Sequence, residues 1–211
     1  MPHSIPHQRP AAPFLDRLET ALRPVAAWGT FRRGARHASV NAILFHRGGE
    51  WRIPFVIRRS DLRSHPGQVG LPGGQIEPDE DGLGAALRET EEELRLSRTA
   101  LRPLGAAPPV YTAATNFMVA TFVTYLSAPP TTFDWDAREL VGVVSVPVRE
   151  LLDRDAWRGP AAAIAADGPF FGRQLATQGV VIWGLTARIM GGLLPLIRAA
   201  CDRGRWCTSG S

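Results

Sequence analysis

Three glutamates between residues 89 and 93 have the spacing of ligands for a divalent metal ion. Glu89 lies three residues before Glu92 and four before Glu93, so a helix would project all three side chains from one face. Like charges at this spacing repel one another and destabilise a bare helix, whereas a hard cation bound between them would offset the repulsion. Carboxylate oxygens are the ligands that Mg²⁺ and Mn²⁺ prefer. The spacing therefore predicts a site for one of these ions.

Acidic runs of this kind are usually solvated helix faces, and that is the alternative interpretation. Neighbouring residues argue against this alternative. The glycine pair Gly73-Gly74 precedes the acidic run, and Glu80 and Arg88 lie between the pair and the run at set distances. A solvated face needs none of these residues at a fixed position. We therefore interpret the whole stretch as a catalytic motif.

The complete spacing resembles the Nudix box, the signature of the Nudix hydrolases. Its elements here are Gly74, five residues, Glu80, seven residues, Arg88-Glu89, two residues and Glu92-Glu93. The resemblance implies an α/β (α+β) fold, a Nudix α/β/α sandwich with a mixed β-sheet between helices. It also implies a pyrophosphohydrolase that uses Mg²⁺ or Mn²⁺ and directs water at a phosphorus atom of a nucleoside diphosphate derivative.

Two positions depart from the motif without removing a carboxylate. Thr90 stands where an aliphatic residue is more common, and Arg95 stands where the family usually has a helix-ending glycine. Arg95 does not enter the left-handed conformation as freely as glycine does. A cation in the last turn also suits the helix dipole, so we expect the helix to run on past Arg95.

The resemblance assigns a role to each residue of the motif. It implies that Glu89 and Glu93 are the main metal ligands and that the carbonyl group of Gly73 completes the shell. Glu92 supports them or binds a second ion. Glu80 lies outside this set of ligands. Arg88 is expected to pair with Glu80 and so to hold the loop against the helix, without touching the substrate.

The general base is the least defined of these roles. In the related subgroup an acidic residue stands at the position that Gly142 occupies here, and Glu139 is the nearest carboxylate to it. Either Glu139 activates the water, or a glutamate of the motif such as Glu92 or Glu93 does so.

The segment before the motif resembles the signature of the coenzyme A pyrophosphatase subgroup. Residues in register with that signature are Arg58, Arg63, Gly67 and Pro72-Gly73-Gly74, while Arg59 replaces a small residue and Leu71 a phenylalanine. The resemblance implies hydrolysis of coenzyme A or its derivatives to adenosine 3′,5′-bisphosphate and 4′-phosphopantetheine or its acyl form.

The arginines of this segment are the candidates for substrate binding. The planar guanidinium group matches phosphate oxygens in a bidentate manner, and coenzyme A carries a pyrophosphate and a ribose 3′-phosphate. In a chain whose 24 cations are all arginine, they could also be ordinary surface residues. We favour substrate binding for Arg58 and Arg63. For Arg59 we favour the surface interpretation, with substrate binding as the alternative.

Two other functions compete with coenzyme A hydrolysis. One is hydrolysis of a different nucleoside diphosphate derivative, such as ADP-ribose or a dinucleoside polyphosphate, which the changes at Arg59 and Leu71 leave open. The other is a non-catalytic nucleotide sensor, against which the intact set of motif carboxylates argues.

The elements that position these residues follow from hydrophobic periodicity and turn residues. Strands are expected at Ala38–Phe45, Trp51–Ile57, Arg102–Ala106, Phe117–Leu126 and Leu140–Val146, with an extended pair at Phe170–Arg173 and Val180–Trp183. Helices are expected at Pro13–Val25, Asp81–Leu96, Val148–Asp153 and Leu185–Ala200, and a loop at Arg58–Pro72. This irregular alternation favours a mixed sheet with helices on both faces. Residues 13–203 are expected to form a single domain between a disordered tail, 1–12, and a C-terminal tail, 204–211.

The composition limits the partners and the compartment. A chain of 211 residues with 45% hydrophobic content can bury one sizeable core, and its net charge of +4 suits an anionic small molecule. Basic and aromatic residues do not interleave, so no nucleic-acid platform is indicated. With no bilayer-spanning run and no signal peptide, we expect a cytoplasmic protein with no membrane partner. Cys201 and Cys207 are expected to be free thiols. The sequence is also compatible with a homodimer.

Overall fold

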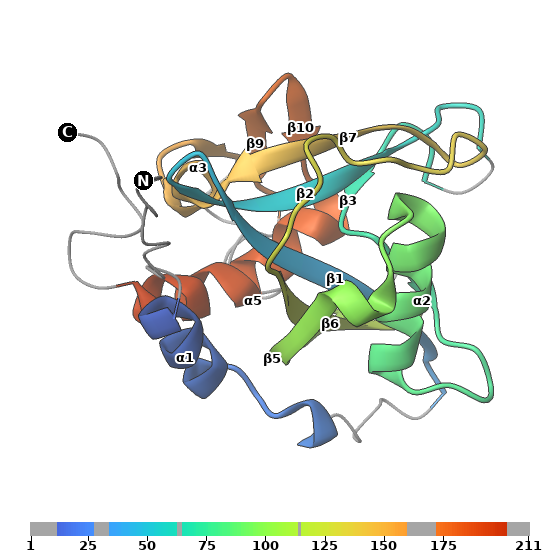
Figure 1. The fold of residues 1–211 in the computed structure, drawn as a ribbon. Helices are drawn as coiled ribbons and strands as arrows, with labels where there is room; N and C mark the ends of the chain where they lie inside the picture. Colours follow the sequence, from blue (N-terminus) through green and yellow to red (C-terminus); the bar gives the residue numbers. More distant parts are fainter. Residues whose placement is uncertain (1–11, 28–33, 63–64, 114, 160–171, 202–211) are drawn as a thin grey trace, which may run out of the picture.

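A mixed β-sheet forms the centre of the computed structural model, which describes residues 12–27, 34–62, 65–113, 115–159 and 172–201 (Figure 1). Its strands are β1 (Arg36–Arg47), β2 (Glu50–Arg58), β3 (Val69–Gly70), β4 (Gly73–Gln75), β5 (Leu101–Thr112), β6 (Phe117–Leu126) and β7 (Leu140–Pro147). The order is β3-β2-β1-β6-β5, with β4 paired to β1 and β7 paired to β2. The pair β1–β6 is parallel and the others are antiparallel, so the predicted mixed sheet is confirmed.

Helices cover both faces of this sheet. They are α1 (Ala12–Ala21), α2 (Gly82–Leu94), α3 (Val148–Leu152) and α5 (Gly184–Ala200), with short 3₁₀ turns η1 (Val25–Ala27) and η2 (Arg98–Ala100). Side chains of a strand alternate between its two faces. Asn41 of β1 contacts α2, whereas its neighbour Val40 lines a cavity together with Ile189 of α5, so α2 and α5 lie on opposite faces. This is the expected α/β/α arrangement.

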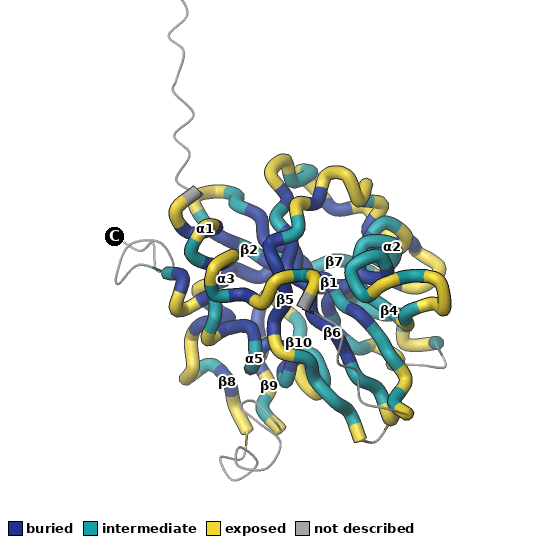
Figure 2. The backbone as a smooth tube through the Cα atoms, turned by 90° about the horizontal axis from the view of Figure 1, so that it is seen from below, coloured by how far each residue is buried: buried dark blue, intermediate teal, exposed yellow. Residues whose placement is uncertain are grey.

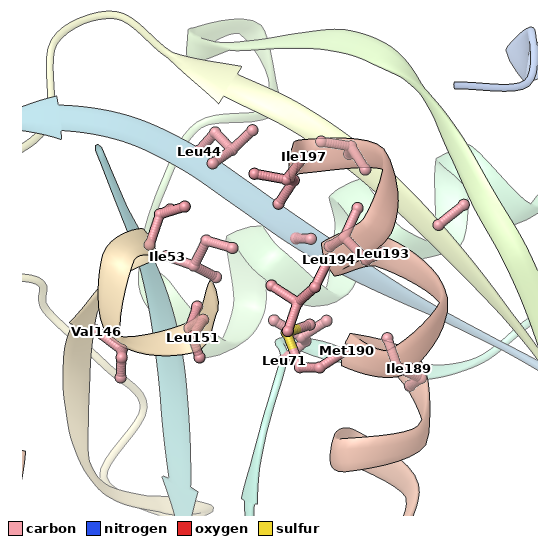
Figure 3. Close-up of a cluster of buried hydrophobic side chains, with 14 of the residues drawn as sticks. Leu44, Ile53, Leu71, Val146, Leu151, Ile189, Met190, Leu193, Leu194 and Ile197 are labelled. Carbon is pink, nitrogen blue, oxygen red and sulfur yellow. The ribbon is translucent and has the colours of Figure 1, made fainter. Parts of the chain in front are cut away.

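The core is built on both faces, as the burial along the chain shows (Figure 2). Ile43 and Phe45 of β1 pack with Leu94 on the face of α2, while Leu44 packs with the C-terminal helix. Figure 3 shows the second group, in which Ile189 and Ile197 of α5 face the sheet. Because β1 is buried on both sides, its sequence reads as a continuous apolar run interrupted by a few polar residues.

The sheet divides between β1 and β2. One end of β1 pairs with β4 through Ala38–Val40, and the other pairs with β2 only from Phe45 onward. The loop at Pro72 fills the gap, because the amide of Asn41 donates to the Pro72 carbonyl at 2.9 Å. This gap is the place where residues on the two faces of the sheet can meet.

The expectation that the acidic helix runs on past Arg95 is wrong. The helix ends at Leu94, and Arg95 itself adopts the left-handed conformation with φ 55°. Its amide donates to the Glu91 carbonyl, and its guanidinium lies 3.9 Å from the Asp136 carboxylate. These contacts hold the non-glycine residue in a conformation that glycine would enter more easily.

Several boundaries also differ from the expected ones. The N-terminal helix stops at Ala21, because Arg23 pairs with Ala106 of β5 in an isolated bridge. The expected loop 58–72 contains the short strand β3. The expected tail 1–12 lies outside the described residues except for Ala12, which begins α1, and the expected tail 204–211 lies outside them entirely.

The late extended pair is displaced along the chain. β9 (Gln174–Thr177) pairs with β10 (Val180–Ile182) and, on its other side, with β8 (Trp157–Arg158), in a small second sheet. The expected first member began at residue 170, and residues 170 and 171 lie outside the described residues. Gln178 and Gly179 supply the turn with positive φ values.

Two further observations concern the whole described chain. Cys201 is disulfide-bonded, which contradicts the expectation of a free thiol there, and Cys207 lies outside the described residues. None of the described helices combines the length and apolar character needed to cross a bilayer.

Candidate active site

A buried polar network fixes the acidic helix α2 to strand β1. The side-chain amide of Asn41 donates to the Thr90 hydroxyl at 3.0 Å, and Thr124 of β6 donates to the Asn41 side-chain carbonyl at 2.9 Å. Thr90 in turn donates to the Ala86 carbonyl at 2.7 Å. All three polar side chains are fully buried, so each hydrogen bond is shielded from water. This network gives a physical reason for a threonine where the related motif usually has an aliphatic residue.

The start of the helix is held in the same way. Asp81 caps it by accepting from the Gly84 amide at 2.6 Å, and Ser39 of β1 donates to the Gly82 carbonyl at 2.6 Å. Because Ser39 and Asn41 lie on the same face of β1, two consecutive inward positions of one strand contact α2.

The glycine loop approaches the sheet and the helix closely. A Cβ at Gly73 would lie 2.3 Å from the Ser39 carbonyl oxygen, and one at Gly74 would lie 2.2 Å from Oε1 of Glu89. The Gly73 amide donates to Oε2 of Glu93 at 3.1 Å. Side chains at these two positions would therefore push the loop away from both carboxylates.

Arg88 lies at the centre of an ionic network. It makes the predicted pair with Glu80, donating from Nε and Nη2 at 3.1 and 2.7 Å, and Nη2 also donates to the Gln75 carbonyl. Hydrogen bonds from Arg88 lower the pKa of the Glu80 carboxyl, and Glu80 in turn raises the pKa of the guanidinium. Arg88 thus connects the loop to the helix.

The same arginine also holds two of the predicted metal ligands, which the sequence did not predict. Its Nη1 donates to Glu89 at 2.9 Å and to Glu92 at 3.2 Å. Glu93 points elsewhere, toward the Gly73 amide and Arg58, whose Nη1 lies 3.4 Å from Oε1 of Glu93. The three carboxylates come from one helix face, but they are divided between two sets of partners.

Burial dominates the electrostatics of the innermost carboxylate. The Glu93 side chain is only 5% exposed. Loss of hydration raises the pKa of its carboxyl to about 8, against the opposing hydrogen bond from Gly73. Burial also raises the pKa of Glu89, and Arg88 partly offsets this. Both carboxylates would be stabilised as anions by an added cation.

The chemistry of these donors fits a divalent ion, although the site is not preassembled. Glu89, Glu92 and Glu93 supply hard oxygen atoms, and the buried Glu93 has Arg58 as an ion-pair partner at 3.4 Å. Within the described part of the chain, no three acidic, histidine or cysteine side chains converge as they stand.

Of the other predicted residues, Arg58 and Glu139 reach the carboxylates. Arg58 lies at the end of β2 and donates to Glu93 and Glu139, with both distances 3.4 Å. Glu139 precedes β7, which pairs with β2, and its side chain is 53% exposed. The pairing of two strands thus brings together residues that are 81 positions apart in the sequence.

Arg59 points away from this site. It pairs with Asp61 at 2.7 Å and donates to the Ala137 carbonyl, and it lines a separate depression beside Trp135 and Arg138. Arg63 lies outside the described residues. Of the described arginines that were predicted to bind the substrate, therefore, only Arg58 contacts the carboxylates of the site.

A chamber beside the carboxylates is lined mainly by residues outside the predicted site. Its volume is about 540 Å³, and Arg58, Gly73 and Glu93 line one part of it. Apolar side chains from β1, β6 and α5 line the rest: Ala38, Val40, Phe117, Val119, Leu185 and Ile189. The only signal in the sequence was the apolar alternation of these elements, which is also typical of ordinary core. The polar residues Ser39 and Asn41 inside the apolar strand β1 lie on the opposite face, where they contact α2.

Comparison with known proteins identifies the family to which this chain belongs. The model of the NUDIX domain family matches residues 35–166. The protein named "Uncharacterized Nudix hydrolase NudL" from Yersinia enterocolitica is 33% identical over 167 residues, which cover 77% of this chain and 82% of the relative. Among solved structures, an Ap4A hydrolase from C. elegans is 20% identical with a TM-score of 0.45, covering 53% of this chain and 80% of that one. The family model spans the sheet, the glycine loop and α2, and with the relative's similarity over most of both chains it establishes that this chain belongs to the Nudix hydrolases.

Proposed function

We propose that this Nudix hydrolase cleaves the pyrophosphate bond of coenzyme A or its acyl derivatives. The products are adenosine 3′,5′-bisphosphate and 4′-phosphopantetheine or its acyl form. The observation that carries the proposal is the position of Arg58, the first arginine of the subgroup signature, between Glu93 and Glu139. A guanidinium at this place can bind the phosphate oxygens of a diphosphate that reaches the carboxylates.

The reaction is a displacement at phosphorus. The oxygen of a water molecule forms a bond to one phosphorus, the bridging P–O bond breaks, and the leaving phosphate takes the electron pair. When bound, Mg²⁺ or Mn²⁺ neutralises charge on the diphosphate and lowers the pKa of water. Glu89, Glu92 and Glu93 would hold the ion, with the Gly73 carbonyl as a further ligand. Arg88 and Glu80 keep the loop and the helix in register.

Glu139 is our candidate for the general base. Its carboxylate is half-exposed beside Arg58, and it is not engaged by Arg88. Glu93 is less suitable because one of its oxygens already accepts from the Gly73 amide, and Glu92 because it accepts a hydrogen bond from Arg88. Replacement of Glu139 by Gln should therefore lower kcat.

A second candidate is hydrolysis of another nucleoside diphosphate derivative, such as ADP-ribose or a dinucleoside polyphosphate. It is favoured by Arg59, which replaces a small residue of the coenzyme A signature and turns away from the site. A non-catalytic nucleotide sensor is disfavoured, because the Nudix glutamates and their arginine partner are all present.

A substrate panel tests the proposal. The purified chain is incubated with Mg²⁺ or Mn²⁺ and coenzyme A, ADP-ribose or a dinucleoside polyphosphate, and products are separated by chromatography. We expect the highest kcat/KM for coenzyme A, and no products from the Glu89→Gln protein. A preference for ADP-ribose would overturn the coenzyme A assignment. Nucleotide binding without turnover of any substrate would favour the sensor.

A further inference from the structure

The chamber beside the carboxylates lies on the face of the sheet opposite to α2. Val40 and Val119, from the adjacent strands β1 and β6, form part of its floor, and Leu185 and Ile189 of α5 form the facing wall. Glu93 reaches it from the other face, where β1 and β2 diverge. The chamber is therefore continuous with the place where a diphosphate would meet the metal ligands.

The wall contributed by α5 lies beyond the part of the chain that the family model matches. That match ends at residue 166, whereas α5 begins at Gly184. Thr186 ties the helix to the glycine-loop side by donating to the Val69 carbonyl at 2.9 Å. Figure 3 shows Met190 beside Leu71 at this end of the helix. The catalytic motif and this wall thus come from separate parts of the chain.

In the described lining of the chamber, the charged side chains other than the catalytic residues are exposed. Four ionisable side chains occur in its described lining: Arg36, Arg58, His65 and Glu93. Arg36 and His65 are exposed, and Arg36 stacks over the Phe117 ring at 4.2 Å. Arg58 and Glu93 belong to the site for the diphosphate. Neutral hydrogen-bonding groups are also present: Gln68, Gln75, Thr112, Thr115 and Thr186.

We propose that this chamber holds the uncharged arm of the diphosphate substrate, and that Leu185 and Ile189 select that arm. A second charged nucleotide would lose hydration against the apolar wall, where the described cationic side chains other than Arg58 are only the exposed Arg36 and His65. An arm with methyl groups and a few amides matches both the apolar surface and the neutral polar groups. The identity of that arm as pantetheine rests on the proposed function, whereas the location and polarity of the subsite do not.

The test uses a polar substitution of nearly equal size. Leu185→Gln is the main variant because Leu185 is only half-buried at the start of α5, and Ile189→Thr is the second. The control is Leu196→Gln, a half-buried leucine on the same helix that does not line the chamber. Circular dichroism and thermal melts establish that all variants fold, and Mn²⁺ titration followed by electron paramagnetic resonance measures metal affinity separately from turnover.

Two measurements report on the arm itself. We expect the kcat/KM ratio of coenzyme A to ADP-ribose to fall about tenfold in Leu185→Gln, mainly through KM, as expected for loss of complementary apolar contacts. Pantetheine, which has no phosphate, should inhibit the unmutated enzyme competitively and inhibit Leu185→Gln about tenfold less well. Leu196→Gln should match the unmutated enzyme in both measurements, with the same Mn²⁺ affinity in all variants.

The outcomes separate this inference from the proposed function. An equal loss on both substrates in Leu185→Gln, or an unchanged ratio in both chamber variants, would overturn the subsite even if coenzyme A is the best substrate. If another diphosphate with an uncharged, apolar arm is cleaved best and loses efficiency selectively in Leu185→Gln, the subsite stands and the coenzyme A assignment fails.

Discussion

Gly74 lies directly against Glu89: a Cβ on Gly74 would come within 2.2 Å of Oε1 and 2.4 Å of Cδ of that side chain. We predict that Gly74→Ala displaces the Glu89 carboxylate and weakens Mn²⁺ binding and turnover by at least tenfold, since a metal ligand would be moved. Stability should change by less than about 1 kcal/mol, because the carboxylate is the end of a flexible side chain. Titration with Mn²⁺ and denaturant unfolding measure the two effects.

The control for this variant is Gly142→Ala. A Cβ at Gly142 would meet only the Ile57 side chain, at an ordinary 3.8 Å, and Gly142 lies in β7. Metal binding that is equally strong in both alanine variants would contradict the close contact at Gly74.

Thr90→Val tests the buried network between β1 and α2. Valine has nearly the same shape as threonine but leaves the Asn41 side-chain amide without its partner. An unsatisfied buried donor costs about 1–3 kcal/mol, and we expect that loss in the free energy of unfolding. Urea denaturation gives the value. Thr90→Ser keeps the hydroxyl and should recover most of it, whereas equal losses in both variants would point to packing of the methyl group instead.

Glu93→Gln and Glu89→Gln should each leave a folded protein whose hydrolysis is reduced by several orders of magnitude. Each substitution removes a charge that would hold the ion at the reacting phosphates. The test compares steady-state rates of the variants and the unmutated enzyme at saturating Mg²⁺. Circular dichroism checks that the variants fold. Near-normal turnover in either protein would remove that residue from the set of metal ligands.

The stability of the metal-free protein should depend on the ionisation of Glu93. Its pKa in the folded protein is about 8, above the ordinary value of 4.5, so the folded state holds the proton more tightly than the unfolded chain. The resulting stabilisation is complete below about pH 4.5 and is lost as the pH rises through 8. Between pH 6 and pH 8 the free energy of unfolding should fall by on the order of 2 kcal/mol.

Comparison with Glu93→Gln isolates this effect, because glutamine does not titrate. Urea unfolding in a chelator at several pH values gives the difference between the two proteins. Added Mg²⁺ should restore stability to the unmutated chain at pH 8 and not to the variant. A difference between the proteins that does not vary with pH would show that Glu93 is ionised throughout.

Arg63 provides a prediction about the ribose 3′-phosphate. If it binds this group, Arg63→Ala should lower the preference for coenzyme A over dephospho-coenzyme A by about ten- to a hundredfold, the effect of one charge-assisted hydrogen bond. Activity toward ADP-ribose, which lacks the phosphate, should change much less. Equal losses on all three substrates would assign Arg63 to the pyrophosphate or to the loop.

The features that the sequence predicted correctly depend on local spacing. The helical face of Glu89 and Glu93 and the pair of Arg88 with Glu80 follow from helix periodicity and a short loop. The meeting of Arg58 with Glu139 could not be derived in this way, because it depends on the register of β2 against β7. Registers are set by packing across the whole sheet.

The errors have related causes. Arg95 was expected to continue the helix because its intrinsic preference opposes the left-handed conformation, but contacts with Glu91 and Asp136 outweigh that preference. The hairpin that begins at Gln174 was placed too early because apolar residues alone do not mark where a turn falls. The position of Leu185 and Ile189 beside a chamber could not be predicted, because an apolar stripe on a helix looks the same in sequence whether it faces core or cavity.

The placement of α2 and α5 on opposite faces of the sheet has a consequence for how this protein can diverge. If Leu185 and Ile189 select the substrate arm as proposed, substitutions in residues 184–200 change which compound is preferred, while residues 82–94 keep the same reaction. Substitutions at distant sites that share no partners usually act independently. Directed evolution of a new substrate range should therefore find its productive changes in the C-terminal helix and leave the acidic helix untouched.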